Sequence, residues 1–79
     1  MPYITPETRA TAWVRPEGAG PLCYSICKDI QDYRTRMGDS FATFADIVAA
    51  LDVAMSEFKR CVLEPYEQRK REENGDVWI

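Results

Sequence analysis

Residues 44–66 read FADIVAALDVAMSEFKRCVLEPY, and this stretch decides the fold. Its large apolar side chains recur every three or four residues, the spacing that places side chains on one face of an α-helix. At about 100° per residue they fall within roughly a third of the circumference. The members of this stripe are Phe44, Ile47, Val48, Leu51, Met55, Phe58, Val62 and Tyr66. The stretch therefore predicts a long helix, from about residue 44 to about residue 73.

Local signals limit and interrupt this helix. Thr43 is the expected N-cap, with Asp46 three residues on as a short version of the capping box. Asn74-Gly75 is the expected stop, because glycine adopts the left-handed cap conformation without steric cost. Pro65 lies inside the helix, where a proline removes one backbone hydrogen bond and costs about 3 kcal/mol. We expect the helix to kink near residues 62–64 and then to continue.

A first helix is predicted for residues 21–37. Pro21 suits a first helical turn, and Gly38 follows the last turn at a favoured cap position. The apolar residues have helical spacing, namely Leu22, Ile26, Ile30, Tyr33 and Met37.

Residues 1–20 are rich in proline and glycine and predict an arm or loop. Within it, Thr5 as N-cap followed by Pro6 and Glu7 permits one short helix. Trp13 is the expected anchor of the arm on the rest of the chain.

The predicted fold class is all-α, with a helical hairpin (21–37 and 44–73, the second helix kinked near Pro65), an N-terminal arm and a tail over 74–79. At 79 residues the chain is expected to form one small domain. Residues 44–55 are apolar almost all round, so this part of the helix needs cover on more than one side. The arm and a second chain are the two candidates for that cover, and a homodimer is the preferred one.

Composition restricts the chemistry. The chain has three cysteines and no histidine, which excludes Ser-His-Asp and Cys-His catalysis. Cys23 and Cys27 lie one helical turn apart, which suits reduced, buried thiols better than a disulfide or a zinc site. Gly18 and Gly20 follow no strand, so a phosphate-binding loop is not expected. The sequence therefore predicts no enzyme, no metal and no cofactor.

Charge and hydropathy indicate the environment. The formal net charge is −3, and it lies in the second half of the chain, so direct nucleic-acid binding is disfavoured and a basic partner is favoured. No apolar run reaches the roughly 20 residues of a membrane span, and no signal-peptide pattern follows the start. We expect a cytoplasmic protein, in the host cytoplasm if a phage encodes it.

Three groups of residues are candidates for binding. Asp46, Glu57 and Glu64 form a row opposite the apolar stripe, which is either a solvated face or an acidic ridge for a basic groove. Tyr66 and the tail residues Asp76 and Trp78 are aromatic and acidic anchors, since an apolar tail suits docking on the chain itself or on a partner. A third set would instead stack a base and hold a phosphate, namely Tyr24, Arg60 and Arg69.

Three stretches together resemble a family of small phage- and prophage-encoded proteins of unknown function. They are MPYI (1–4), GPLCYSICKDIQDY (20–33) and SEFKRCVLEPYEQRKREENGDVW (56–78). The matching positions are Gly20, Leu22, Tyr24, Ile26, Glu57, Phe58, Arg60, Pro65, Tyr66, Glu67, Lys70, Glu73, Asn74, Gly75, Asp76 and Val77. The chain departs from the family pattern at Lys59 and Cys61 and in its Trp-Ile ending.

The resemblance implies a phage setting, where small acidic proteins without catalytic groups often inhibit host defence. By analogy it suggests an anti-CRISPR-type inhibitor that binds a host defence complex, such as a type I CRISPR effector, and denies it DNA. Two alternatives stay open: an oligomeric sponge that sequesters a nucleotide immune signal, and a structural or accessory phage protein.

Overall fold

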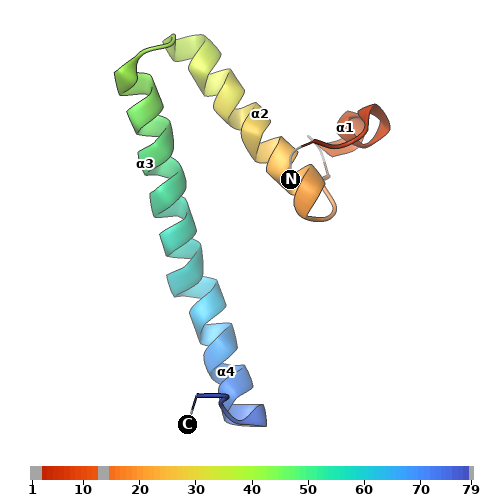
Figure 1. Cartoon of the computed structure of the whole chain (residues 1–79), viewed down its shortest axis with the longest axis vertical. Helices are drawn as coiled ribbons and strands as arrows, with labels where there is room; N and C mark the ends of the chain where they lie inside the picture. The colour runs from red at the N-terminus through yellow and green to blue at the C-terminus, as the bar shows by residue number, and fades with distance from the viewer. Residues whose placement is uncertain (1–2, 13–14, 79) are drawn as a thin grey trace. The chain divides into compact units, whose positions relative to one another are not determined.

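The computed structural model describes residues 3–12 and 15–78, and within these ranges the chain is all-α, as predicted. The elements are α1 (Pro6–Ala12), α2 (Ala19–Met37), α3 (Phe41–Phe58), the π-helix η1 (Lys59–Leu63) and α4 (Glu64–Asn74), as Figure 1 shows. They divide into two compact units, Met1–Phe44 and Ala45–Ile79, which we describe separately. Trp13, the predicted anchor of the arm, and Ile79 lie outside the described residues.

The short helix anticipated in the arm is α1. Thr5 is its N-cap, because the Thr5 hydroxyl accepts the Thr8 amide at 3.2 Å and the Thr5 carbonyl accepts the Arg9 amide at 2.9 Å. Pro6 takes the first helical position, where its missing N–H costs nothing. These local hydrogen bonds order part of the arm, and within the first unit α1 also contacts α2.

The α2 helix begins at Ala19, two residues before the predicted start, and ends at Met37 as predicted. Gly38 closes it with a positive φ of 85°, and its N–H donates to the Arg34 carbonyl at 2.9 Å. A feature that was not predicted lies just beyond. The Arg34 guanidinium donates from Nε and Nη2 to the two Asp39 carboxylate oxygens, at 2.6 Å and 2.8 Å. This bidentate pair joins the last turn of α2 to the link that follows it.

The start of α3 corrects the sequence prediction. The N-cap is Ser40 and not Thr43: the Ser40 hydroxyl accepts the Thr43 amide at 3.1 Å, and the Ser40 carbonyl accepts the Phe44 amide at 3.0 Å. Thr43 is already in the first turn, and its hydroxyl accepts a hydrogen bond from Ser40 Oγ at 3.2 Å. The helix therefore begins three residues before the predicted position.

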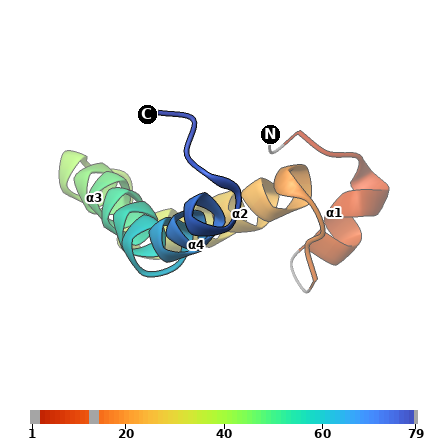
Figure 2. The same ribbon diagram turned by 90° about the horizontal axis from the view of Figure 1, so that it is seen from below.

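The predicted kink near Pro65 takes the form of a π-helical turn, η1. The Glu64 amide donates to the Lys59 carbonyl, a bond over five residues instead of four. Proline cannot donate to the residue four positions back, and its ring would clash with that carbonyl, here of Cys61. A wider turn before Pro65 moves this carbonyl away, so the chain continues without a break from α3 into α4 (Figure 2).

Burial is slight throughout the described ranges. Thr43 is the single buried residue among them, with 5% of its surface exposed. In the second unit, every described residue is exposed except Ile47, which is half-buried. The apolar stripe predicted from the sequence is thus present on the helix but uncovered.

Candidate functional site

The predicted partner-binding residues all belong to the long helix and its tail. Asp46 and Glu57 are on α3, Glu64 and Tyr66 are on α4, and Asp76 and Trp78 follow the end of α4. All of these side chains are exposed. Their spacing along the helix, and not burial, therefore decides which of them form one surface.

The predicted acidic row does not stay in line across η1. A π-turn inserts the equivalent of one extra residue, which rotates everything after it by about 100° relative to a continuous α-helix. Glu64 follows this turn, so it leaves the side that Asp46 and Glu57 share. Glu57 is also engaged within the chain, because its carboxylate accepts Arg60 Nη2 at 2.7 Å. Among the three, Glu64 is the carboxylate that makes no hydrogen bond or ion pair with the described residues.

The end of α4 brings three of the predicted residues together, namely Tyr66, Asp76 and Trp78. They line one groove, which we call the tail groove and which also includes Glu67, Lys70, Arg71, Asn74, Gly75 and Val77. Figure 2 shows the tail leaving the end of α4. Within the second unit, the tail thus lies beside the face of α4 that carries Tyr66, Lys70 and Asn74.

Gly75 and Asp76 give the tail groove its shape. Gly75 has a φ of 86°, and its N–H donates to the Arg71 carbonyl at 2.9 Å, which ends α4 at the predicted stop. The Asp76 carboxylate then accepts the Trp78 amide at 2.9 Å and lies 3.8 Å from Arg71 Nε. Asp76 thus folds the tail locally, while the Trp78 side chain remains 88% exposed. The Asp76 carboxylate therefore holds the tail backbone, and the Trp78 indole stays exposed.

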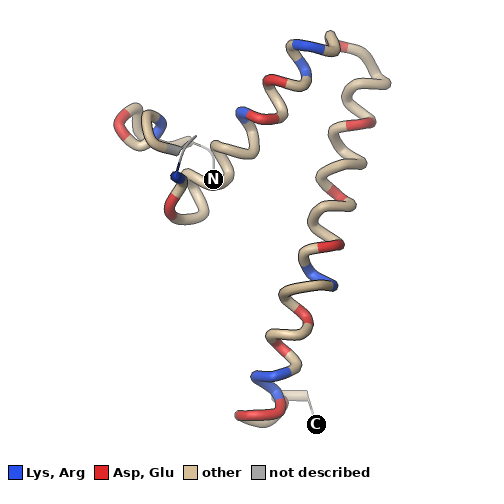
Figure 3. The backbone as a smooth tube through the Cα atoms, turned by 180° about the vertical axis from the view of Figure 1, so that it is seen from behind, with Lys and Arg blue, Asp and Glu red and all other residues tan. Residues whose placement is uncertain are grey.

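Cations lie around Tyr66 on the same helix. Lys70 Nζ is 5.7 Å and Arg69 Cζ is 5.9 Å from the centre of the Tyr66 ring. Arg71 donates to Gln68 Oε1 at 2.6 Å, and Lys70 lies 3.8 Å from Glu73. Figure 3 shows the cations of α4 as one run with acidic residues before and after it. Lys70 and Arg71 thus have acidic neighbours in Glu73 and Asp76, whereas Glu67 in the tail groove has no ion-pair partner in the described chain.

The alternative ligand-binding set is not assembled by either unit. Tyr24 is on α2 in the first unit, whereas Arg60 and Arg69 are in the second. Within the second unit Arg60 lies in η1 and is bonded to Glu57, and Arg69 is on α4 beside Tyr66.

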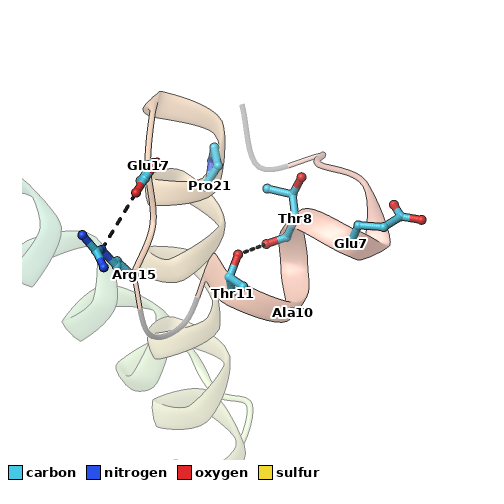
Figure 4. Close-up of a pocket in the computed structure, with 7 residues that line it drawn as sticks. All are labelled: Glu7, Thr8, Ala10, Thr11, Arg15, Glu17 and Pro21. Atoms are coloured by element: carbon cyan, nitrogen blue, oxygen red, sulfur yellow. Dashed lines mark hydrogen bonds and ion pairs between the residues drawn. The ribbon is translucent and has the colours of Figure 1, made fainter.

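A second hollow lies between α1 and the start of α2 (Figure 4). Its walls are mostly small or polar, with a Thr11 hydroxyl donating to the Thr8 carbonyl at 3.3 Å and Arg15 Nε 3.9 Å from Glu17. Glu7 points away along the rim in this view. These lining side chains include no nucleophile paired with a base.

The cysteines are free thiols. Cys23 and Cys27 are half-buried on α2, and Cys61 is exposed. Burial, and secondarily the neighbouring Cys23, raises the pKa of the Cys27 thiol above its ordinary value, so this thiol is poorly nucleophilic at neutral pH. In the ranges that the structure describes, no three His, Cys, Asp or Glu side chains gather as metal ligands. No described helix combines the length and apolarity needed to cross a membrane.

Comparison with known proteins identifies the family and no function. A family model described as a domain of unknown function (DUF6899) matches residues 1–77. The chain belongs to this family. Neither the curated proteins nor the solved structures gave a match.

Proposed function

We propose that this DUF6899 protein is a non-catalytic binding protein that acts by docking its C-terminal segment onto another protein. The observation that supports the proposal is the tail groove, which combines an 88% exposed Trp78 with Tyr66 and with unpaired Glu67. Aromatic side chains held by local backbone structure are typical anchors of protein interfaces, because they bury large areas at little cost in conformational entropy.

The partner that this surface suits is basic. Glu64 and Glu67 are on the first turn of α4 and have no cation within the described chain. The chain as a whole carries a net charge of −3. Carboxylates of this kind complement a surface lined for phosphates, and such complementarity mainly speeds and orients association. The proposed acidic surface is therefore Glu67 in the tail groove together with Glu64 on the same first turn of α4, and not a straight row of Asp46, Glu57 and Glu64.

In its finer form, the proposal is that the chain inhibits a bacterial defence complex of the type I CRISPR class by occupying its DNA-binding surface. This form rests on the family resemblance to phage-encoded proteins and on the acidic, aromatic character of the tail groove. The inhibitor would work in the host cytoplasm and would need no cofactor. A nucleotide sponge has less support, because the Arg60 guanidinium already donates to the Glu57 carboxylate.

A plating assay tests the inhibitor. A strain with an active type I CRISPR system directed at a phage is expected to regain plaque formation when it expresses the chain. Purified chain and purified effector complex should bind each other, with an affinity that falls between low and high salt because charge pairs are screened. Unchanged immunity in cells that accumulate the folded protein would rule out this class of target.

Substitutions in the tail groove test whether the partner binds there. Trp78→Ala should raise the dissociation constant by about 30-fold, the effect of losing a hot-spot aromatic of roughly 2 kcal/mol. Glu64→Gln with Glu67→Gln should weaken binding at low salt and reduce its salt dependence. Glu72→Gln with Glu73→Gln removes the same charge from the end of α4 and is the matched control. Equal losses from both pairs would show a general charge effect instead of a defined site.

A further inference from the structure

The long helix carries an uncovered heptad seam. Its members are Val48, Leu51, Met55, Phe58, Val62 and Tyr66. Their successive spacings of three and four residues are those of a helix that packs lengthwise against another helix. Each is between 42% and 67% exposed. The step from Val62 to Tyr66 spans four residues, whereas the heptad pattern requires three. The π-turn η1 accommodates one extra residue, so Tyr66 takes the heptad position that Pro65 would occupy in a continuous α-helix.

This chain has few means of its own to cover the seam. All three cysteines are free, and the described residues contain no metal cluster. α2 has 19 residues and is shorter than the apolar stretch from Phe44 to Tyr66. Small chains that lack disulfides and metals usually gain stability by oligomerisation. An apolar surface of this length on a soluble domain typically marks an interface.

Two charged residues beside the seam indicate what covers it. Asp52 follows Leu51 and Lys59 follows Phe58, seven residues apart, so the two side chains flank the seam on the same side. Neither makes a hydrogen bond or ion pair with any described residue. From Phe41 to Phe58 the helix bears acidic residues and no cation, and the first cation is Lys59 (Figure 3).

Symmetry decides how these charges would meet. When two copies of a helix pair antiparallel about a two-fold axis, each flank faces the same flank of the other copy. In one such register, Met55 of one copy and Phe58 of the other lie at the same height along the helix axis. Leu51 of one copy then lies at the same height as Val62 of the other. Asp52 then lies within about two residues, or 3 Å along the axis, of Lys59 in the second copy. In a parallel pair opposite flanks face each other, and these charges do not meet.

We propose that the chain forms an antiparallel homodimer through this seam, with Asp52 of each copy paired to Lys59 of the other. The contact is formed twice by symmetry and sets the orientation, as flanking charges do in helix pairs. In this register Cys61 of one copy lies level with Asp52 of the other along the axis, and about nine residues away from its own equivalent. The dimer therefore needs no disulfide. It is independent of the proposed inhibitory function, because its evidence lies on the seam and not in the tail groove.

The first experiment measures association of the full chain by sedimentation equilibrium under reducing conditions. The wild type should be a dimer. Asp52→Lys and Lys59→Glu should each raise the dimer dissociation constant by about tenfold, because each places like charges at two symmetric contacts. The double variant D52K/K59E recreates the pair with its charges exchanged and should return to within about threefold of the wild type. Glu72→Lys makes the same acid-to-lysine change away from the seam and should leave association unchanged.

The outcomes separate the possible occupants of the seam. A monomer at all concentrations would overturn the proposal and assign the seam to this chain's own first unit or to another protein. A dimer in which the double variant is as weak as the single variants would overturn the antiparallel pairing. Circular dichroism of each variant shows whether its helices are retained, so loss of folding is not mistaken for loss of association.

Disulfide trapping tests the orientation separately. The three native cysteines are replaced by serine, and a single cysteine is placed at Leu51 or at Val62. Mixing L51C with V62C should give a cross-linked heterodimer, whereas each alone should cross-link poorly. Efficient self-cross-linking of L51C would show a parallel pair and contradict the proposal. Because neither residue lies in the tail groove, a failed inhibition assay and a failed dimer test remain distinguishable.

Discussion

A single hydroxyl group fixes where α3 begins. Ser40 Oγ accepts the Thr43 amide at 3.1 Å, which satisfies one of the otherwise unpaired N–H groups of the first turn. Ser40→Ala should lower the free energy of unfolding by about 1 kcal/mol, the usual cost of losing an N-cap. Urea denaturation followed by circular dichroism measures it. Ser40→Asp keeps an acceptor at this position and should be nearly neutral. If Thr43→Val cost more than Ser40→Ala, Thr43 would be the dominant cap.

The sequence could not separate these two caps. Ser40 and Thr43 both carry the required hydroxyl, and Asp46 follows Thr43 at the spacing of a capping box. Phe41 and Ala42 lie outside the apolar stripe, so periodicity did not extend the helix to Ser40. By contrast Thr5, Gly38 and Gly75 had no competing residue nearby, and the structure confirms all three helix ends.

The Arg34–Asp39 pair predicts an acid dependence at the end of α2. Hydrogen bonds from Arg34, and secondarily its charge, hold the pKa of Asp39 below its ordinary value. The pair therefore contributes stability at pH values above the unfolded pKa and loses it as the pH falls through the lower, folded pKa. The thermal midpoint should fall on acidification below about pH 4 more steeply in the wild type than in Asp39→Asn.

The control for this effect is Asp29, an acid on α2 without an ion pair in the described chain. Asp29→Asn should leave the acid slope of the wild type unchanged. High salt should reduce the difference between wild type and Asp39→Asn, because the pair is exposed and screened. Parallel pH curves for wild type and Asp39→Asn at low salt would contradict the assignment.

At the scale of the element, η1 determines which side chains of α4 share a face with α3. Continuous 100° steps, the only assumption that the sequence allows, predict Glu64 in line with Asp46 and Glu57. Pro65 was recognised as an interruption, but the pattern does not reveal whether a proline bends a helix or widens one turn. The widened turn preserves the apolar seam and breaks the acidic row, so the stripe was predictable and this part of the candidate site was not.

Pro65→Ala tests this account of η1. The substitution restores an N–H group and removes the ring that clashes with the Cys61 carbonyl, so the turn should tighten to an α-helix. This relieves a local cost of up to about 3 kcal/mol and rotates Tyr66 and the rest of α4 by about 100° about the helix axis relative to α3. Hydrogen exchange should show a protected amide at residue 65, and carbon chemical shifts should change over residues 59–63.

Pro21 provides the matched control, because it lies in the first turn of α2, where amides have no helical partner. Pro21→Ala should leave the chemical shifts over the body of α2 unchanged. If Pro65→Ala likewise altered only its immediate neighbours, the π-turn would have to come from packing or from the surrounding sequence instead of the proline.

At the scale of the whole molecule, the sequence correctly gives an all-α chain and its apolar stripe, but it does not give the tail groove. That groove depends on Gly75 at a φ of 86° and on Asp76 accepting the Trp78 amide, which are details of backbone conformation. Aromatic and acidic residue types had marked Tyr66, Asp76 and Trp78 as candidates, and local folding puts them side by side. The groove also includes Lys70 and Arg71.

The exposed seam predicts that thermal stability depends on protein concentration. If folding and dimerisation are linked, mass action stabilises the folded state as the concentration rises. For a domain of this size, a tenfold increase in concentration should raise the thermal midpoint by about 4–5 °C. Differential scanning calorimetry over a hundredfold range measures this directly. Met55→Glu places a charge at the centre of the seam and should lower the midpoint and abolish its concentration dependence, while Glu72→Lys should keep it. A wild-type midpoint that stays constant over this range would mean that the helices do not need a second copy to remain folded.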